Sequence, residues 1–279
     1  MIWRVRGRDW DLARRGAIMG ILNVTPDSFS DGGSYLSVDA AVSHALEMVD
    51  AGTEIIDIGG ESTRPGSEPV DADEELRRTI PVIQALRGQT TAHLSIDTSK
   101  AIVAREALAA GADIVNDVTG LRGDPEMASV CADSRAGVVI MHMQGTPRTM
   151  QSAPHYSDVV ADVREFFRHS LEQAVSSGID PMSIALDPGI GFGKTFDHNR
   201  TLLRSLPEFG TFGRPLLIGV SRKSFLGAIA GSNDMADRFW PGVALTSFCR
   251  ERGARILRVH DVQPHREALR MTEAIVGDA

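Results

Sequence analysis

Short apolar runs recur along the chain, and amphipathic segments separate them. The runs occupy residues 17–22, 54–59, 93–97, 113–117, 137–142, 183–187, 215–220 and 255–260. Between them, apolar residues recur near helical spacing in segments 39–52, 73–86, 100–112 and 158–178. Nearly continuous apolar strands that alternate with helices indicate a parallel sheet covered on both faces. Eight such units within about 250 residues predict an α/β fold, a single (β/α)8 TIM barrel.

The opening stretch WRVRGRDWDL, residues 3–12, fits no strand–helix unit. We expect it to form a short hairpin-like extension that closes the bottom of the barrel. A doubly wound open sheet is the structural alternative, and we favour it less because the count of units reaches eight without adjustment. The chain contains no low-complexity segment and no linker rich in Pro, Gly or Ser. Residues 1–279 are therefore predicted to form a single domain.

Composition narrows the classes of function. The formal net charge is -8 and no basic run occurs, which disfavours binding to nucleic acid or to an anionic membrane. Any bound anion must therefore meet a local cluster of positive groups. The two cysteines, Cys131 and Cys249, are unclustered, and the N-terminus lacks the apolar core of a signal peptide. No apolar run reaches membrane-spanning length, so we expect a soluble, cytoplasmic protein.

Polar residues stand at the end of every apolar run, where barrel enzymes build their active sites. In chain order they are Asn23, Asp57, Asp97, Asn116, His142, Asp187, Ser221 with Lys223, and Arg258 with His260. One set offers both donors and acceptors: Asp97, Asn116, Asp187 and Lys223. Such a set suits a flat heterocycle edged with amino, ring N–H and carbonyl groups. The alternative is a set of caps and buried salt bridges, with Lys223 merely neutralising Asp187; together the four residues favour a site.

Arg258, His260 and Asn23 form a second set. A pair of cationic residues at the exit of the last strand lies where barrels commonly bind phosphate. Asn23 is the neighbour across the seam and can supply an oxygen to Mg²⁺, which usually keeps several waters. The alternative is a strand end in which Asp261 holds His260 or caps the next helix, and that interpretation leaves Arg258 without a role.

Two segments after the first and second strands, residues 23–33 and 59–69, have the Gly, Pro, Ser and Asp content of surface loops. Phe29 and Arg64 suit loops that fold over a substrate, although local packing explains a surface Phe equally well. The Met-rich stretch 141–151 is expected to fill gaps near the barrel mouth.

The stretch DPGIGFGKTFDHN, residues 187–199, contains the ingredients of a phosphate-binding loop. A Walker A motif ending in Gly193, Lys194 and Thr195 requires glycine at position 188, where Pro188 has no N–H to donate. The dinucleotide fingerprint also fails, because Lys194 replaces its last glycine. We therefore expect the glycines to allow tight backbone turns and Lys194 to face solvent.

Eight signatures give the chain its resemblance to a known family. They are GILNVTPDSFSDGG, DIGGESTRPG, SIDTSK, IVNDVTG, VIMHMQGTP, LDPGIGFGKT, GVSRKSFLG and RVHDV. In this order, between Met19 and Met271, they resemble the dihydropteroate synthases. The resemblance implies a (β/α)8 barrel that condenses 6-hydroxymethyl-7,8-dihydropterin diphosphate with 4-aminobenzoate. The products are 7,8-dihydropteroate and diphosphate, in folate biosynthesis.

The resemblance also assigns residues to each part of the site. The family's pterin pocket falls on Asp97, Asn116, Asp187 and Lys223, and its diphosphate and Mg²⁺ site on Asn23, Thr63, Arg258 and His260. Its aminobenzoate region falls on Arg64, Pro65, Phe192, Ser221 and Lys223, with Phe29 on the covering loop. An aspartate of that loop corresponds to Asp31, with Asp27 as the alternative. The catalytic roles fall on Asp97, Lys223, Arg258 and His260, and the family implies a homodimer.

The chain departs from the family after the seventh strand. Pro241-Gly242 stands where the family usually has a glycine-serine pair, and Phe239-Trp240 precedes it. A sulfonamide-insensitive variant is one hypothesis that follows from this departure. Two other classes of protein remain as rivals: corrinoid methyltransferases that bind methyltetrahydrofolate, and a non-catalytic homologue that acts as a scaffold.

Overall fold

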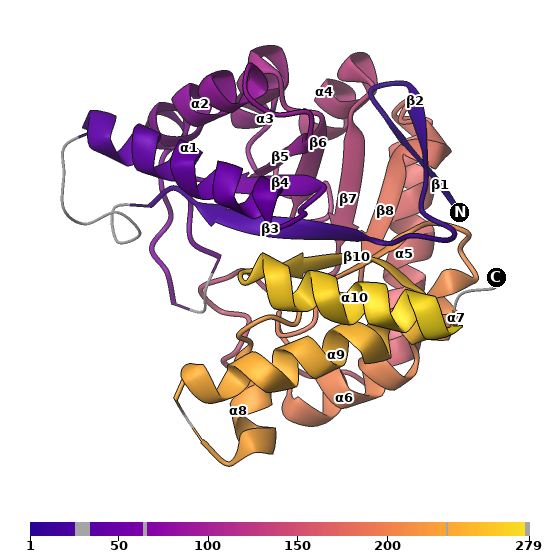
Figure 1. The fold of residues 1–279 in the computed structure, drawn as a ribbon. Helices are drawn as coiled ribbons and strands as arrows, with labels where there is room; N and C mark the ends of the chain where they lie inside the picture. The colour runs from indigo at the N-terminus through magenta and orange to yellow at the C-terminus, as the bar shows by residue number, and fades with distance from the viewer. Residues whose placement is uncertain (26–33, 64–65, 233, 277–279) are drawn as a thin grey trace.

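Eight parallel strands close into a barrel, as predicted (Figure 1). The structure is a computed structural model; it describes residues 1–25, 34–63, 66–232 and 234–276, and of residues 34–37 only the backbone. In order around the barrel the strands are β10 (Ala254–Val259), β3 (Ala17–Asn23), β4 (Ile55–Gly59), β5 (His93–Asp97), β6 (Ile114–Asp117), β7 (Gly137–Met141), β8 (Ile184–Asp187) and β9 (Leu216–Ile218). β10 pairs with β3 on one side and β9 on the other, so the sheet has no free edge.

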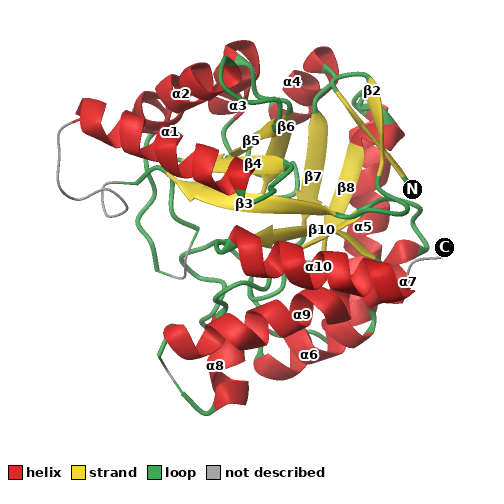
Figure 2. Cartoon of the chain, viewed as in Figure 1, coloured by secondary structure: helices red, strands yellow, loops and turns green. Residues whose placement is uncertain are grey.

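Helices surround the barrel and connect its strands (Figure 2). They are α1 (Ser34–Asp50), α2 (Ala72–Arg87), α3 (Ala101–Ala110), α4 (Met127–Ser134), α5 (Val159–Ser176), α6 (Phe196–Arg204), α7 (Leu206–Gly210), α8 (Ser224–Ala230), α9 (Phe239–Glu251) and α10 (Val262–Val276), with 3-10 turns at Pro181–Ser183 and Ala236–Arg238. Asp158 caps α5 by accepting the backbone N–H groups of Val160 and Ala161. None of the described helices is long and apolar enough to cross a membrane.

The N-terminal hairpin closes the barrel bottom, which confirms the prediction from residues 3–12. β1 (Ile2–Val5) and β2 (Arg8–Asp11) pair antiparallel around a turn in which Arg6 and Gly7 both have positive φ, as a tight hairpin requires. Trp3 is fully buried, and its indole N–H donates to the carbonyl of Ser183 at 2.8 Å. It packs with inward-facing strand residues such as Met19 and Ile256.

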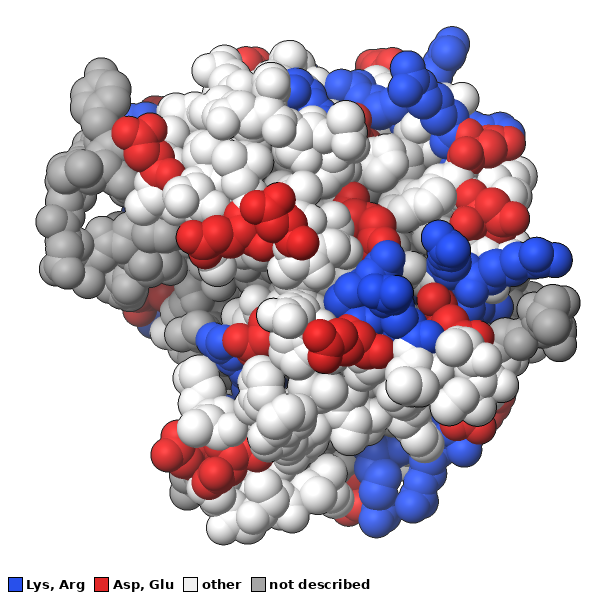
Figure 3. Space-filling model, in the orientation of Figure 1, with Lys and Arg blue, Asp and Glu red and all other residues white. Residues whose placement is uncertain are grey.

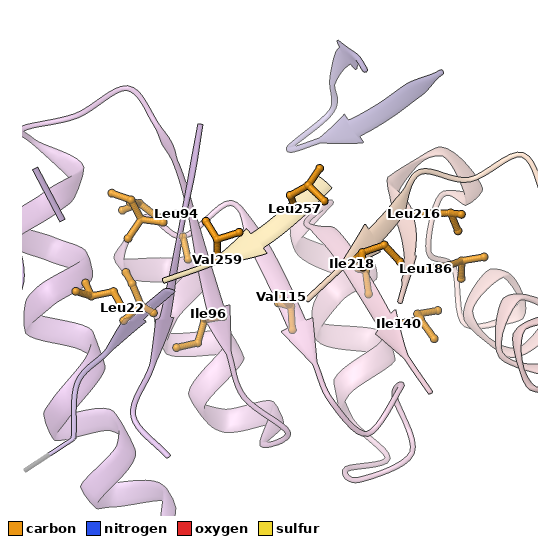
Figure 4. Close-up of a cluster of buried hydrophobic side chains, with 14 of the residues drawn as sticks. Leu22, Leu94, Ile96, Val115, Ile140, Leu186, Leu216, Ile218, Leu257 and Val259 are labelled. Atoms are coloured by element: carbon orange, nitrogen blue, oxygen red, sulfur yellow. The ribbon is translucent and has the colours of Figure 1, made fainter. Parts of the chain in front are cut away.

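Alternate strand residues fill two different layers. Ala17, Met19, Ile55, Val139 and Ile256 belong to the cluster inside the barrel. Their sequence neighbours face the helices and form the larger outer cluster, part of which appears in Figure 4. Because both faces of each strand are buried, the strands appear in the sequence as continuous apolar runs. The polar residues at their ends are the exceptions, and they lie at the other end of the barrel from the hairpin.

The departure at residues 239–242 forms the start of α9. Pro241 lies in the first turn, where backbone N–H groups have no partner within the helix. A Cβ at Gly242 would lie 3.7 Å from the His265 ring, an ordinary contact, and Trp240 is exposed. The same Cβ would lie 3.9 Å from Ser221 Cα, so the departure reaches from the helical layer to the segment that follows β9.

Candidate active site

Four side chains from four strands form a buried hydrogen-bonded chain at the barrel mouth. Arg258 on β10 donates through Nε to Asp57 on β4 at 2.6 Å and through a terminal nitrogen to Asp97 on β5 at 2.7 Å. Asn116 on β6 donates to the same Asp57 oxygen at 3.0 Å. The register of the sheet places Asp97 opposite both Gly59 and Asn116. The two predicted residue sets therefore meet in one network.

Asp57 is the central acceptor of this network, and sequence reasoning assigned it to neither set. It is fully buried, and its second oxygen has no hydrogen-bond partner among the described residues. Its position at a strand end was visible in the sequence. The sequence did not indicate that Arg258 is the hydrogen-bond donor to Asp57, because the two residues are 201 positions apart along the chain.

Burial sets the protonation of these groups. It raises the pKa of Asp97 well above its ordinary value, and the nearby Arg258 guanidinium opposes this shift. Burial also disfavours the charged form of Arg258, but Asp57 and Asp97 outweigh it and keep its pKa above the ordinary value. Arg258 therefore stays charged, whereas Asp97 gains a proton more readily than an exposed aspartate. The guanidinium is committed to two carboxylates as well as being a candidate phosphate ligand.

Asp187, Lys223 and Phe192 lie together on the opposite side of the mouth. Asp187 accepts the backbone N–H of Gly189 at 2.7 Å, and burial raises its pKa to about 6. The Lys223 ammonium lies 3.8 Å from the centre of the Phe192 ring, and burial together with Arg258 lowers its pKa to about 8. Lys223 and Asp187 attract each other without forming an ion pair. The simple neutralising pair that we considered from the sequence is therefore absent between these two described residues.

The glycines of residues 187–199 form tight turns, as expected. Gly189, Gly191 and Gly193 have φ values of 67°, 83° and 64°. A Cβ at Gly189 would lie 1.9 Å from the carbonyl oxygen of His142, so no side chain fits there. Thr195, the last residue of the apparent P-loop, caps α6 by accepting the N–H of His198.

Lys194 is buried, and the prediction that it faces solvent is wrong. Its side chain is only 3% exposed because the turns at the glycines fold the loop back across the mouth. The ammonium donates to the carbonyls of Phe192 at 3.0 Å and His142 at 3.3 Å, and it lies 3.0 Å from His142 Nδ1. Burial lowers the pKa of Lys194 to about 7 and that of His142 to about 2, so this imidazole is neutral. Lys194 thus ties the loop that carries Phe192 to the end of β7.

Replacing Lys194 with methionine is expected to lower the free energy of unfolding at pH 7 by about 2–3 kcal/mol, because the carbonyls of His142 and Phe192 lose a buried donor. Urea denaturation measures this loss. The effect should be larger at pH 9 than at pH 7. Because the pKa of Lys194 is lowered in the folded chain, the free energy of unfolding of the wild type rises from about pH 7 toward the ordinary lysine pKa of 10.5, and the variant lacks this gain. Thr195→Ser, which keeps the helix cap, is the matched control, and an equal loss there would contradict the assignment.

His260 and Ser221 meet at the seam between β9 and β10. The His260 backbone N–H donates to Ser221 Oγ at 3.3 Å, and its ring Nδ1 lies 3.1 Å from the same oxygen. Asp261 pairs instead with Arg222 at 2.7 Å, so it does not hold His260. The serine hydroxyl thus orients the imidazole toward the rim, next to Arg258.

The remaining predicted residues follow the first two strands. Asn23 ends β3 and Thr63 follows β4; both are half-buried. Four predicted residues and one alternative lie outside the described residues: Phe29, Asp31, Arg64, Pro65 and Asp27.

An apolar cluster forms one wall beside this polar rim. Phe192 packs with Val118, Met141, Met143 and Met150, all buried. The methionines fill the space around the Phe192 ring, which confirms the expectation from their sequence. A flat ring that lies against this wall can present its polar edges to Asn116 and Asp187.

The donor chemistry at Asn23 fits a magnesium ion carried by a phosphate-bearing substrate. No group of three or more His, Cys, Asp or Glu suited to a metal occurs in the described part of the chain. Mg²⁺ bound to substrate phosphates needs only one or two protein oxygens and keeps its waters. The half-buried Asn23 at the end of β3, a strand that pairs with β10, offers such an amide oxygen.

A closed parallel barrel whose strand ends converge on a buried polar rim defines the class of protein: a (β/α)8-barrel enzyme. Residues 19–260 match the family model described as pterin binding enzyme. The chain belongs to this family and, within it, to the dihydropteroate synthases, which makes it a transferase.

Three relatives illustrate the match. Dihydropteroate synthase of Synechocystis is 48% identical over 266 residues, which cover 95% of this chain and 92% of the relative. The Yersinia pestis enzyme, solved as a sulfonamide drug complex, superposes with a TM-score of 0.93 at 45% identity over 100% of both chains. The Xanthomonas albilineans enzyme, solved with 4-aminobenzoic acid, superposes with a TM-score of 0.92 at 45% identity, also over 100% of both.

Proposed function

We propose that the chain condenses 6-hydroxymethyl-7,8-dihydropterin diphosphate with 4-aminobenzoate to give 7,8-dihydropteroate and diphosphate. The observation that carries this proposal is the buried rim in which Asp97, Asn116 and Asp187 lie near the cations Lys223 and Arg258. It offers complementary groups both to a polar heterocycle and to an anionic leaving group.

The pterin is held by its polar edges. The ionised Asp187 carboxylate accepts from the amino and ring N–H groups, and the Lys223 ammonium donates to the ring carbonyl and nitrogen atoms. Asn116 has one amide hydrogen bond committed to Asp57, which fixes the orientation of its amide for the ring. Since all these groups are buried, an analogue that lacks one partner leaves a protein group unpaired and binds poorly.

The diphosphate leaves from the methylene carbon attached to the pterin. Arg258 and His260 neutralise the charge that develops on the leaving group, and Thr63 contributes its hydroxyl. Asn23 would hold Mg²⁺, which supplies additional positive charge to the diphosphate when bound. The electron-deficient methylene is conjugated with the pterin ring and lies near Asp97, whose carboxylate stabilises it electrostatically.

Once the C–O bond to diphosphate has broken, the amine of 4-aminobenzoate attacks the electron-deficient methylene: a C–N bond forms, and the amine nitrogen releases one proton to water. Phe192 and Ser221 border the aminobenzoate side. The family resemblance assigns Arg64, Pro65, Phe29 and Asp31 to the same substrate, and these four lie outside the described residues. No protein nucleophile is required. Burial raises the pKa of both Cys131 and Cys249 to about 12, so these thiols are protonated and do not compete.

Release of diphosphate from the two substrates tests the proposal directly. We expect formation of 7,8-dihydropteroate to depend on both substrates and on Mg²⁺, with one diphosphate released for each product molecule. Diphosphate release that yields no 7,8-dihydropteroate in the presence of 4-aminobenzoate, or methyl transfer from methyltetrahydrofolate, would indicate another reaction. Pterin binding without any release would instead support a scaffold protein.

A plot of kcat/KM against pH should be bell-shaped. Asp187 and Asp97 must be ionised and Lys223 protonated. We therefore expect kcat/KM to rise as these two carboxyls, whose pKa values burial raises, lose their protons, and to fall through about pH 8. In Lys223→Arg the side chain keeps its charge, and the alkaline limb should move upward even though the absolute rate drops. Measurement of kcat/KM for the dihydropterin diphosphate between pH 5 and 9 checks both limbs. An unchanged alkaline limb in the arginine variant would assign that limb to another group.

The homodimer, the magnesium requirement and the cytoplasmic location stay predictions. No observation on the described residues favours a sulfonamide-insensitive variant: the departure at 239–242 begins α9, and even a Cβ at Gly242 would make only ordinary contacts with His265 and Ser221. We therefore expect a sulfonamide to compete with 4-aminobenzoate, and an inhibition constant measured against 4-aminobenzoate decides the question.

A further inference from the structure

A second polar cavity opens on the face of the barrel opposite the candidate active site. Its volume is about 900 Å³, and its walls come from the connection after β2, the start of β10 and the ends of α9 and α10. Six arginines line it: Arg14, Arg15, Arg250, Arg255, Arg266 and Arg270. Figure 3 shows basic side chains gathered near the C-terminal end of α10. Because the whole chain has a net charge of -8, this concentration is a local feature.

Two of the arginines hold the walls in place. Arg250 donates to Glu273 at 2.8 Å and also to the backbone carbonyls of Ala13 and Arg14. Glu273 additionally accepts the N–H of Gly16 at 2.6 Å, and Arg266 pairs with Glu54 at 2.6 Å. These contacts tie α9 and α10 to the connection before β3, so the cavity is bounded by fixed backbone.

Among the described residues, the other four arginines have no acidic partner in contact. Arg14, Arg15, Arg255 and Arg270 form no ion pair with any residue in the described ranges, and the charge of Arg14 helps to lower the pKa of the exposed Asp11. Arg255 is half-buried, and its Nε–H is fully shielded from solvent without a hydrogen-bond acceptor. A buried donor without a partner destabilises the folded chain. An anion bound in the cavity would supply the missing acceptor.

We propose that this arginine cavity binds a small polyphosphate anion, of the kind represented by inorganic tripolyphosphate and the nucleoside triphosphates. The guanidinium fork matches phosphate oxygens in pairs, and a chain of phosphates can engage several arginines at once. A volume of about 900 Å³ lies within the range of small-molecule sites. The site is separate from the proposed diphosphate site, since Arg258 contacts Asp57 and Asp97 at the mouth while Arg255 lines the opposite end of the same strand.

Calorimetric titration of the full chain with inorganic tripolyphosphate tests the proposal. The wild type is expected to bind at two places, the active site and the arginine cavity. Arg258→Gln should lose the first, and Arg255→Gln/Arg270→Gln should weaken the second at least about tenfold, which is 1.4 kcal/mol. Because Arg255 and Arg270 do not touch the reaction, kcat and KM for diphosphate release should stay within twofold in the double variant. A titration with a nucleoside triphosphate distinguishes phosphate recognition from recognition of the base.

Arg105→Gln is the matched control, since it removes an exposed arginine that pairs with Glu126 on another face. Binding lost equally in Arg105→Gln would indicate general charge attraction and overturn the proposal. So would tripolyphosphate binding that disappears completely in Arg258→Gln, or that survives unchanged in the double variant. Sedimentation with anionic phospholipid vesicles is the last arm: a loss of vesicle binding in the double variant without tripolyphosphate binding would replace the proposed ligand with a membrane surface.

Discussion

Arg258→Gln is expected to lower kcat for diphosphate release by about 10²-fold or more. In the structure this guanidinium bridges Asp57 and Asp97, and we propose that it also neutralises the departing diphosphate. Glutamine lacks the charge for the leaving group, and it leaves two buried carboxylates without a cation. The second effect raises the pKa of Asp97 further, so that this residue is protonated over more of the neutral range and stabilises the electron-deficient methylene less well.

Two variants separate these effects from misfolding. Arg258→Lys restores the charge but not the fork that reaches both carboxylates, and its rate should lie between those of the wild type and Arg258→Gln. Arg105→Gln, which removes a surface ion pair, should keep the wild-type rate. Stopped-flow measurement of diphosphate release gives the rates, and urea denaturation reports folding. A normal rate in folded Arg258→Gln would remove this residue from the mechanism.

Asp187→Asn is expected to lower kcat/KM for the dihydropterin diphosphate by about 10²-fold or more, with the same backbone and nearly the same shape. A carboxylate accepts two hydrogen bonds from the pterin edge, and each bond to a charged group contributes about 1.5–3 kcal/mol. An amide accepts at one atom only and turns its NH₂ toward a second donor. The acidic limb of the pH profile should lose the contribution of Asp187, the group that titrates near pH 6, and keep that of Asp97, whose pKa burial also raises.

The free energy of unfolding of Asp187→Asn should not fall along with its kcat/KM. This difference distinguishes a role of Asp187 in pterin recognition from a structural role. The raised pKa of Asp187 means that the native state binds its proton more tightly than the unfolded state, so this group lowers stability as pH rises from about 4 to 6. Asparagine removes that cost, and the free energy of unfolding at pH 7 should be unchanged or higher. Asp158→Asn, at a helix cap where both residues serve, is the control. A large loss of stability in Asp187→Asn would indicate that the carboxylate mainly supports the loop.

The fold was predictable because its determinants are local. Each barrel strand is buried on both faces and therefore appears in the sequence as an apolar run. The amphipathic segments between the runs, in which apolar residues recur near helical spacing, indicate helices. The polar residue at the end of each run was also visible. The family resemblance added the roles, including those of residues such as Arg64 and Asp31 that lie outside the described ranges.

Three features needed the folded chain. Lys194 looked like a solvent-facing residue of a glycine-rich loop, yet the positive φ angles of three glycines bring it into the interior. In the sequence, Asp57 was one of eight polar residues at strand ends. It becomes the central acceptor of the hydrogen-bonded network only because the Arg258 side chain on another strand donates to it. The arginine cavity draws on segments separated by more than 200 residues, so no local pattern indicates it.

The sequence by itself determined the barrel, its bottom hairpin, the family and the identity of the polar rim, since these follow from periodicity, spacing and motifs along the chain. The tertiary structure decided which charges pair, which lysine is buried and where unpaired arginines gather. Those outcomes depend on distances between residues remote in sequence and on the loss of solvent around them. Coulomb interactions depend on the distances between charges in space, and desolvation depends on burial. The order of residues along the chain specifies neither the distances nor the burial directly.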